Sequence, residues 1–173
     1  LSLGEPDFNT PEFIKEAAIQ AVKDNFNSYS PVDGYVDLKA AICEKFKRDN
    51  GLNYKPSQVV VSTGAKQSIA NVCMVLLNPG DEVLLPAPYW VSYSAISTLA
   101  ESKSIIINSS IENDFKITPE QLEAAITPKT KLVMFNSPNN PSGTIYTESE
   151  YRRLGAVLKK YPNIYILSDE ISL

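Results

Sequence analysis

Five short apolar runs constrain the fold of this chain more than any other feature. Each is apolar on consecutive residues, as in Val59-Val60-Val61, Ile105-Ile106-Ile107 and Leu132-Val133-Met134. Strands buried on both faces have this pattern, because helices cover both sides of their sheet. We therefore predict five strands, at residues 58–62, 82–86, 104–108, 131–136 and 164–168.

Helical patterns lie between and before these runs. Residues 69–77 place apolar side chains on one helical face, and the segments after Thr118 and Thr147 begin with capping-box signatures. Two helices precede the first run: one begins at Thr10-Pro11 and the other ends near Asn50-Gly51. The alternation of strands and helices predicts an α/β fold of three layers, α/β/α, with a mostly parallel sheet.

The charge balance argues against two classes of partner. Sixteen Lys and Arg against twenty Asp and Glu give a net charge of −4. A protein that binds nucleic acid or an anionic membrane usually carries a basic surplus. No apolar run approaches the roughly 18–20 residues of a membrane span. We therefore expect no nucleic acid and no membrane, but a small molecule or another protein subunit as partner.

The missing residue types exclude several chemistries. The chain has no histidine, so it cannot build a Ser-His-Asp or Cys-His catalytic pair or a zinc site with histidine ligands. Two cysteines are too few for a cysteine-rich site, so we expect no metal. Cys43 and Cys73 lie in amphipathic helical patterns and are predicted to be small buried hydrophobes. Two thiols without a recognisable signal sequence are typical of a reducing cytoplasm, the location we expect.

Both ends of the sequence suggest a fragment. The chain opens at Leu1-Ser2 without an initiator methionine, and it stops at Leu173, a few residues beyond the last apolar run. A domain ending there would lack the elements that cover its last strand. We therefore expect this chain to be part of a longer protein.

Candidate ligand-binding residues follow the strands, because open α/β sheets bind ligands beyond the carboxyl ends of their strands. Thr63-Gly64-Ala65-Lys66-Gln67 follows the first run and begins a helix. Small residues there let backbone N–H groups approach an anion, and the helix dipole favours negative charge, so a phosphate is the natural ligand. The known nucleotide motifs G-x-G-x-x-G and G-x-x-x-x-G-K-[ST] do not occur. A tight turn with a solvated lysine is the alternative interpretation.

Two further segments supply a flat ring and amide groups. Trp90, the only tryptophan, follows the second run at a proline-rich junction and could stack on a flat ligand or simply pack in the core. Residues 136–143 follow the fourth run with three amides and two prolines. This stiff polar loop could hold a hydrogen bond to a ligand, although plain turns often have the same composition.

An acidic pair follows the fifth run. Asp169 comes at the end of an apolar strand, so its carboxylate is predicted to be poorly solvated and to need a cationic or N–H partner. Alternatively, Asp169 and Glu170 could bind a metal or cap a helix. Together the four strand ends offer an anion cradle, a stacking ring, an amide donor and an acceptor for a protonated heterocycle. Pyridoxal phosphate, a flat phosphorylated ring with a basic nitrogen, would use all four.

Five segments carry a family resemblance over essentially the whole chain. Residues 4–8, 63–67, 88–90, 136–143 and 168–170 resemble, in order and spacing, the class I (fold type I) pyridoxal-phosphate-dependent aminotransferases, and most closely the lysine-containing bacterial aspartate aminotransferases. The resemblance implies the large-domain fold of these transferases, incomplete here. Residues 1–12 would lead from the small domain, and residues 13–173 would form the N-terminal part of the cofactor-binding large domain.

The resemblance also implies a role for each matching residue. In the cofactor site, Gly64, Ala65 and Lys66 would hold the phosphate, Trp90 would stack on the pyridine, Asn140 would donate to the ring hydroxyl, and Asp169 would pair with the ring nitrogen. In the substrate site, Gly4, Lys66, Trp90 and Asn140 would contact the amino acid, with Lys66 facing a distal carboxylate. Tyr29 would reach the phosphate of the neighbouring subunit, which implies a homodimer.

The implied activity is amino transfer between aspartate, or a similar amino acid, and the 2-oxo acid 2-oxoglutarate. An aromatic, prephenate or alanine aminotransferase on the same scaffold, or a non-catalytic binding domain, are the alternatives. The family's Schiff-base lysine and carboxylate-clamping arginine have no match in this chain, so we expect no catalytic residue here and no activity from the chain alone. The lysines and arginines that could be considered for these two roles are predicted to face solvent instead: Lys159, Lys160, Arg48, Arg152 and Arg153. Ser172 stands where the family usually has a tyrosine that is hydrogen-bonded to the ring oxygen of the cofactor. Either that contact is lost or the last residues are an artefact of truncation, and we favour the second.

Overall fold

The computed structural model describes residues 7–170, and the chain divides into two compact units, Leu1–Val61 and Ser62–Leu173. The predicted division at residue 12 stays a prediction.

The first unit is helical. It contains α1 (Glu12–Lys23), α2 (Val36–Asn50) and the short 3₁₀ helix η1 (Pro56–Gln58). The two predicted helices are confirmed, and α2 is followed by its cap Gly51, whose φ of 68° is the left-handed conformation that glycine adopts readily. Cys43 on α2 is only partly buried.

The first predicted strand is wrong. Residues 58–62 contain the end of η1 and then irregular backbone, and the Val60 side chain is 66% exposed. The backbone N–H of Val59 donates to the Pro56 carbonyl and that of Val61 to the Asp33 carbonyl, instead of entering a strand ladder. An apolar β-branched run favours extended backbone, but a strand also needs a neighbour with which to pair.

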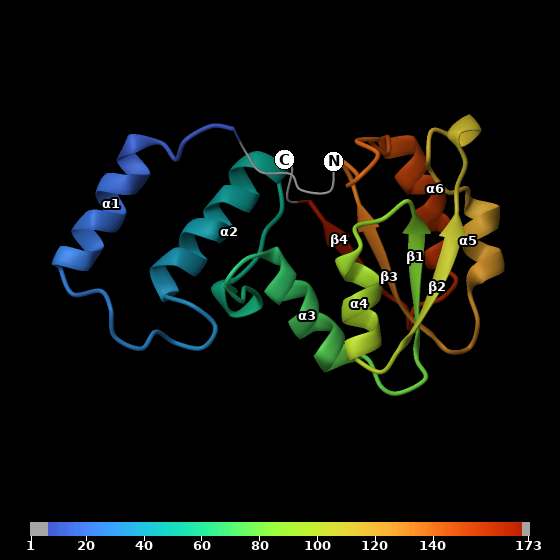
Figure 1. The fold of residues 1–173 in the computed structure, drawn as a ribbon, viewed down its shortest axis with the longest axis horizontal. Helices are drawn as coiled ribbons and strands as arrows, with labels where there is room; N and C mark the ends of the chain where they lie inside the picture. Colours follow the sequence, from blue (N-terminus) through green and yellow to red (C-terminus); the bar gives the residue numbers. More distant parts are fainter. Residues whose placement is uncertain (1–6, 171–173) are drawn as a thin grey trace. The chain divides into compact units, whose positions relative to one another are not determined.

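The other four predicted strands are confirmed to within one residue at each end, and they form one sheet in the second unit. They are β1 (Glu82–Ala87), β2 (Lys103–Asn108), β3 (Thr130–Asn136) and β4 (Tyr165–Asp169). The sheet order is β2-β1-β3-β4 and every neighbouring pair is parallel. Because all four strands run the same way (Figure 1), their carboxyl ends share one edge of the sheet.

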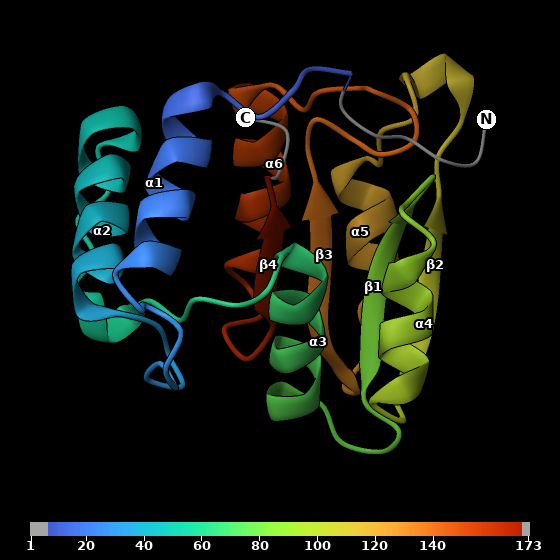
Figure 2. The same ribbon diagram turned by 60° about the vertical axis from the view of Figure 1, so that its left-hand side comes forward.

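Helices cover both faces of this sheet, which confirms the three-layer prediction. On one face lie α3 (Ala65–Leu76) and α4 (Ser92–Leu99), and on the other lie α5 (Pro119–Ala125) and α6 (Glu148–Leu158), as Figures 1 and 2 show. Capping boxes begin α5 and α6 at Thr118 and Thr147, as predicted. The short 3₁₀ helix η2 (Ile111–Asn113) follows β2.

The strands contribute alternate residues to two cores. Val83 and Leu85 pack under α3 and α4, whereas Leu84 between them packs under α5 and α6. All three side chains are fully buried, which is why the run is apolar on consecutive residues. Cys73 on α3 is also fully buried, as expected.

The layer of α3 and α4 determines where a site can form. Both helices run antiparallel to the strands and begin at the carboxyl edge of the sheet (Figure 2). Their N-terminal N–H groups therefore lie at the edge where β4 ends in Asp169. None of the helices within residues 7–170 combines the length and the apolar character that crossing a bilayer requires.

Candidate functional site

Asp169 is the last residue of β4 and lies half-buried at the carboxyl edge of the sheet. Its Oδ2 accepts a hydrogen bond from the Tyr93 hydroxyl at 2.6 Å, and its backbone carbonyl accepts one from Asn136 Nδ2 at 2.9 Å. We expected a cationic or N–H partner for this carboxylate. Among the described residues the side-chain partner is instead the buried Tyr93 hydroxyl.

Tyr93 connects Asp169 to the α3 side of the site. It lies in the first turn of α4 and is only 1% exposed. Its ring meets Trp90 edge-to-face with centroids 5.6 Å apart, and Lys66 Nζ lies 4.9 Å from the Trp90 ring centroid. A continuous series of contacts therefore runs from the first turn of α3, across Trp90 and Tyr93, to Asp169.

Gly64 shapes the start of α3. Its φ of +86° with ψ of 160° is a conformation that side-chain-bearing residues avoid, and a Cβ placed there would meet nothing within 4 Å. No side chain among residues 7–170 caps this helix, and its Gln67 and Ser68 N–H groups bond to the Gly64 carbonyl. Ala65 and Lys66 lie in the first turn, where backbone N–H groups have no carbonyl partner within the helix. The start of α3 therefore presents open space and two hydrogen-bond donors to an anion.

The loop after β3 is built on two asparagine side chains. Asn136 is buried, and its Oδ1 accepts from the Asn140 backbone N–H at 2.7 Å while its Nδ2 donates to the Asp169 carbonyl. Asn139 Nδ2 donates to the Pro88 carbonyl at 3.1 Å and its Oδ1 accepts from Ser142. This network fixes the loop against β4 and against the segment that leads to Trp90, and it leaves Asn140 exposed.

Six of the residues proposed for the cofactor lie in the second unit at the carboxyl edge of its sheet: Gly64, Ala65, Lys66, Trp90, Asn140 and Asp169. Tyr29 belongs to the first unit, where it is fully exposed. Gly4 and Ser172 lie outside the described residues. The other predicted solvent-facing residues are confirmed as exposed: Lys159, Lys160, Arg48, Arg152 and Arg153.

Tyr93, Asn136 and Asn139 were not singled out by the sequence analysis. Tyr93 follows Trp90 by three residues, but a tyrosine near the start of a helix carries no signal that its hydroxyl faces a strand 76 residues later. Asn136 and Asn139 were included only as members of an amide-rich loop. Their side chains determine the shape of that loop, whereas the resemblance pointed to Asn140.

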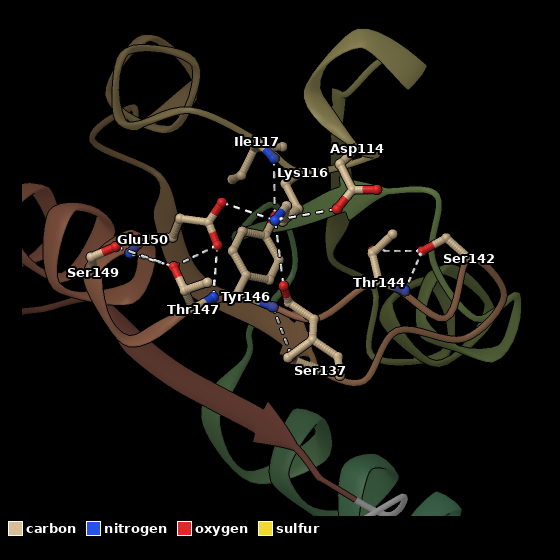
Figure 3. A network of polar contacts seen from close by, with 11 residues as sticks. Asp114, Lys116, Ile117, Ser137, Ser142, Thr144, Tyr146, Thr147, Ser149 and Glu150 are labelled. Atoms are coloured by element: carbon tan, nitrogen blue, oxygen red, sulfur yellow. Dashed lines mark hydrogen bonds and ion pairs between the residues drawn. The ribbon is translucent and has the colours of Figure 1, made fainter.

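The opposite face of the sheet carries a second polar network (Figure 3). Lys116 Nζ lies 2.9 Å from Glu150 Oε1 and 3.3 Å from Asp114 Oδ2, beside a cavity of about 330 Å³. The Tyr146 hydroxyl accepts the Ile117 N–H at 3.0 Å. The backbone N–H of Thr147, and next the Lys116 ammonium, lower the pKa of Glu150 to about 2. Within residues 7–170, no three His, Cys, Asp or Glu side chains form a group that could hold a metal ion.

Comparison with known proteins identifies the family. The family model "Aminotransferase class I and II" matches residues 1–171. The chain belongs to the class I and II aminotransferases. It is 52% identical to the aspartate/prephenate aminotransferase of Nitrosomonas europaea over 171 residues, which are 99% of this chain and 43% of that protein. It is 47% identical to the aspartate aminotransferase of Rhizobium meliloti, with 99% of this chain and 42% of that protein covered.

Solved structures of this aminotransferase family match the fold closely. The crystal structure of the Rhizobium meliloti aspartate aminotransferase aligns with a TM-score of 0.95 at 48% identity, covering 96% of this chain and 42% of that one. An aromatic aminotransferase from Pyrococcus horikoshii aligns with a TM-score of 0.93 at 34% identity, covering 98% and 45%. The chain therefore has the fold of the aminotransferase large domain, and it spans about 43% of the length of the curated relatives it matches.

Proposed function

We propose that the protein containing this chain is a pyridoxal-phosphate-dependent aminotransferase that moves an amino group between aspartate, or a similar amino acid, and 2-oxoglutarate. One observation carries the proposal. The open N-terminus of α3 and the carboxylate of Asp169 belong to the same edge of one sheet and are connected through Lys66, Trp90 and Tyr93. Membership of the aminotransferase family supports it.

The residues fit this cofactor by their chemistry. Gly64 leaves room beside two helix N–H donors, which suit a phosphate, and Asp169 offers a half-buried carboxylate, which suits a protonated ring nitrogen. Bound there, pyridoxal phosphate supplies an electron sink for the carbanion that forms when an amino acid loses its α-proton.

Each residue would then have one task. Ala65 and Lys66 bind the phosphate through their backbone N–H groups, and Asp169 keeps positive charge on the ring nitrogen by its own negative charge. Trp90, half-buried and in T-shaped contact with Tyr93, would offer a ring face on which the pyridine stacks. Asn140 would donate to the ring hydroxyl and to the α-carboxylate of the substrate.

Lys66 is proposed to select a dicarboxylic substrate. Its ammonium group is exposed and lies over the Trp90 ring, next to the proposed cofactor site, where it can meet a second carboxylate. Prephenate, which the name of the Nitrosomonas europaea relative includes, and aromatic amino acids are the competing substrates. Lys66→Ala should reduce kcat/KM for aspartate about tenfold, the size expected for one lost hydrogen bond between charged groups, while aromatic substrates lose little. Lys159→Ala, which removes an exposed lysine after α6, should change neither.

Tyr29 is exposed, so it is available to a second subunit, and we propose a homodimer in which it contacts the phosphate of its neighbour. The cytoplasmic location expected from the two thiols stays a prediction.

The proposed activity is tested by loading the full-length protein with pyridoxal phosphate. We expect an absorption band in the visible or near-ultraviolet range, retention of the cofactor after borohydride reduction, and transfer of the amino group from aspartate to 2-oxoglutarate. The present chain alone should not transaminate, because it lacks the lysine that anchors the cofactor and moves the proton. A full-length protein that neither retains the cofactor nor transfers the amino group contradicts the proposal.

A further inference from the structure

The two oxygens of the Asp169 carboxylate differ in what they contact. Oδ2 accepts the hydrogen bond of the Tyr93 hydroxyl at 2.6 Å. Oδ1 has no hydrogen-bond donor among residues 7–170, so it is the oxygen left for a ligand. The main chain of the same residue is held by Asn136, which donates to the Asp169 carbonyl. The carboxylate is thus held at one oxygen and at its backbone, with its other oxygen open.

The Tyr93 hydroxyl is itself held in place. The side chain is 1% exposed within the core between the sheet and the helices α3 and α4, and it lies against the Trp90 ring. Burial, and then the adjoining Asp169 carboxylate, raise the pKa of this hydroxyl above its ordinary value. Tyr93 therefore stays protonated and donates its hydrogen bond to the carboxylate.

We propose that Tyr93 is a positioning residue that holds the Asp169 carboxylate so that its open oxygen meets the ring nitrogen of the bound cofactor and keeps the shared proton there. This inference rests on the proposed function. A hydrogen bond at one carboxylate oxygen fixes the orientation of the group, and a carboxylate held beside the ring nitrogen favours the protonated form of that nitrogen. In the contact between Asp169 and the ring nitrogen, the proton then stays with the nitrogen. The ring remains cationic, which is the form that accepts electrons.

A buried tyrosine on the other face of the sheet provides a matched control. Tyr146 is 8% exposed, and its hydroxyl accepts the backbone N–H of Ile117 instead of contacting a carboxylate. Replacing either tyrosine by phenylalanine removes one buried hydroxyl. Only Tyr93→Phe removes a hydrogen bond to the Asp169 carboxylate. Comparing the two variants therefore separates the proposed role from a general loss of packing or hydrogen bonding.

The test is nitrogen-15 NMR of the full-length protein loaded with pyridoxal phosphate labelled at the ring nitrogen. We expect the wild-type resonance near the value of a protonated pyridine, and we expect Tyr93→Phe to shift it toward the unprotonated value. Tyr146→Phe should leave it in place. The kcat of Tyr93→Phe should fall about tenfold, the size expected for one hydrogen bond to a charged group, while KM for the amino acid changes little.

Asp169→Asn provides the second arm, because it removes the charge through which Tyr93 is proposed to act. In that background Tyr93→Phe should produce no further shift of the resonance. An equal shift with and without the charge of Asp169, or an unmoved resonance in a loaded Tyr93→Phe protein, overturns this inference alone. A wild-type full-length protein that takes up no cofactor overturns the proposed function and this inference together.

Discussion

The two faces of the sheet each bury a tyrosine, and the two hydroxyls have different partners. On the face of α3 and α4, Tyr93 donates to the carboxylate of Asp169. On the face of α5 and α6, Tyr146 accepts the backbone N–H of Ile117. The first hydrogen bond ends on a charged group at the carboxyl edge of the sheet, whereas the second satisfies a backbone group inside the fold.

The surrounding polar groups follow the same division. Near Tyr146, Lys116 lies between two carboxylates, and Thr147 and Glu150 cap α6, so these charges are paired within the fold. Near Tyr93, the start of α3 has no side-chain cap within residues 7–170, and Asp169 keeps one carboxylate oxygen open. Residue type and burial are therefore poor guides to function here, and the partner of each polar group is the better one.

The largest effect is expected from Asp169→Ala, which removes the carboxylate at the end of β4, in the proposed cofactor site. Removing one partner of a desolvated charge pair costs about 2–5 kcal/mol, so pyridoxal phosphate should bind at least about thirtyfold more weakly. Equilibrium dialysis of the full-length protein measures the dissociation constant. Glu170→Ala, which removes the exposed carboxylate next along the chain, is the control and should leave the constant unchanged. Equal affinities for Asp169→Ala and wild type would refute the role given to Asp169.

Tyr146→Phe should have an intermediate effect, on stability and not on the cofactor. The Ile117 N–H would lose its buried acceptor, which costs about 1–3 kcal/mol. Urea denaturation of the full-length protein should show a lower free energy of unfolding, with the dissociation constant of pyridoxal phosphate unchanged. A variant that keeps its stability but loses the cofactor would reverse the division between the two faces.

Glu150→Gln should have the smallest effect, and one that depends on pH. The folded-state pKa of Glu150 is about 2, below its ordinary value of 4.5. A lowered pKa stabilises the fold at pH values above 4.5, and this contribution is lost as the pH falls toward 2. Because the group is partly exposed, we expect a difference of no more than about 1 kcal/mol near neutral pH. Thermal denaturation should show this difference shrinking in acid, and a difference that stays constant from pH 7 to pH 3 would contradict the assignment.

The sequence predicted the second unit better than the first. Four strands and the capping boxes at Thr118 and Thr147 followed from local patterns, because buried parallel strands and helix starts depend on neighbouring residues. The run at residues 58–62 has the same composition but pairs with no strand among the described residues, and pairing is not a local property. The wrong strand came from that difference.

The candidate site was predicted in part, as the fold was. Asp169, Trp90 and the start of α3 were found because each follows an apolar run or a strand-to-helix junction in the sequence. Tyr93 and Asn136 were not, because their importance lies in contacts with Asp169 across 76 and 33 residues of chain. Motifs identify groups that could touch a ligand, whereas only the folded chain shows which side chains hold those groups in place.

The most direct measurement is a crystal structure of the full-length protein with pyridoxal phosphate bound. The ring nitrogen should lie within about 3 Å of the open oxygen of Asp169, and a phosphate oxygen should lie within about 3 Å of the Ala65 or Lys66 N–H. A phosphate bound away from the start of α3, or a ring whose nitrogen faces away from Asp169, would contradict the account.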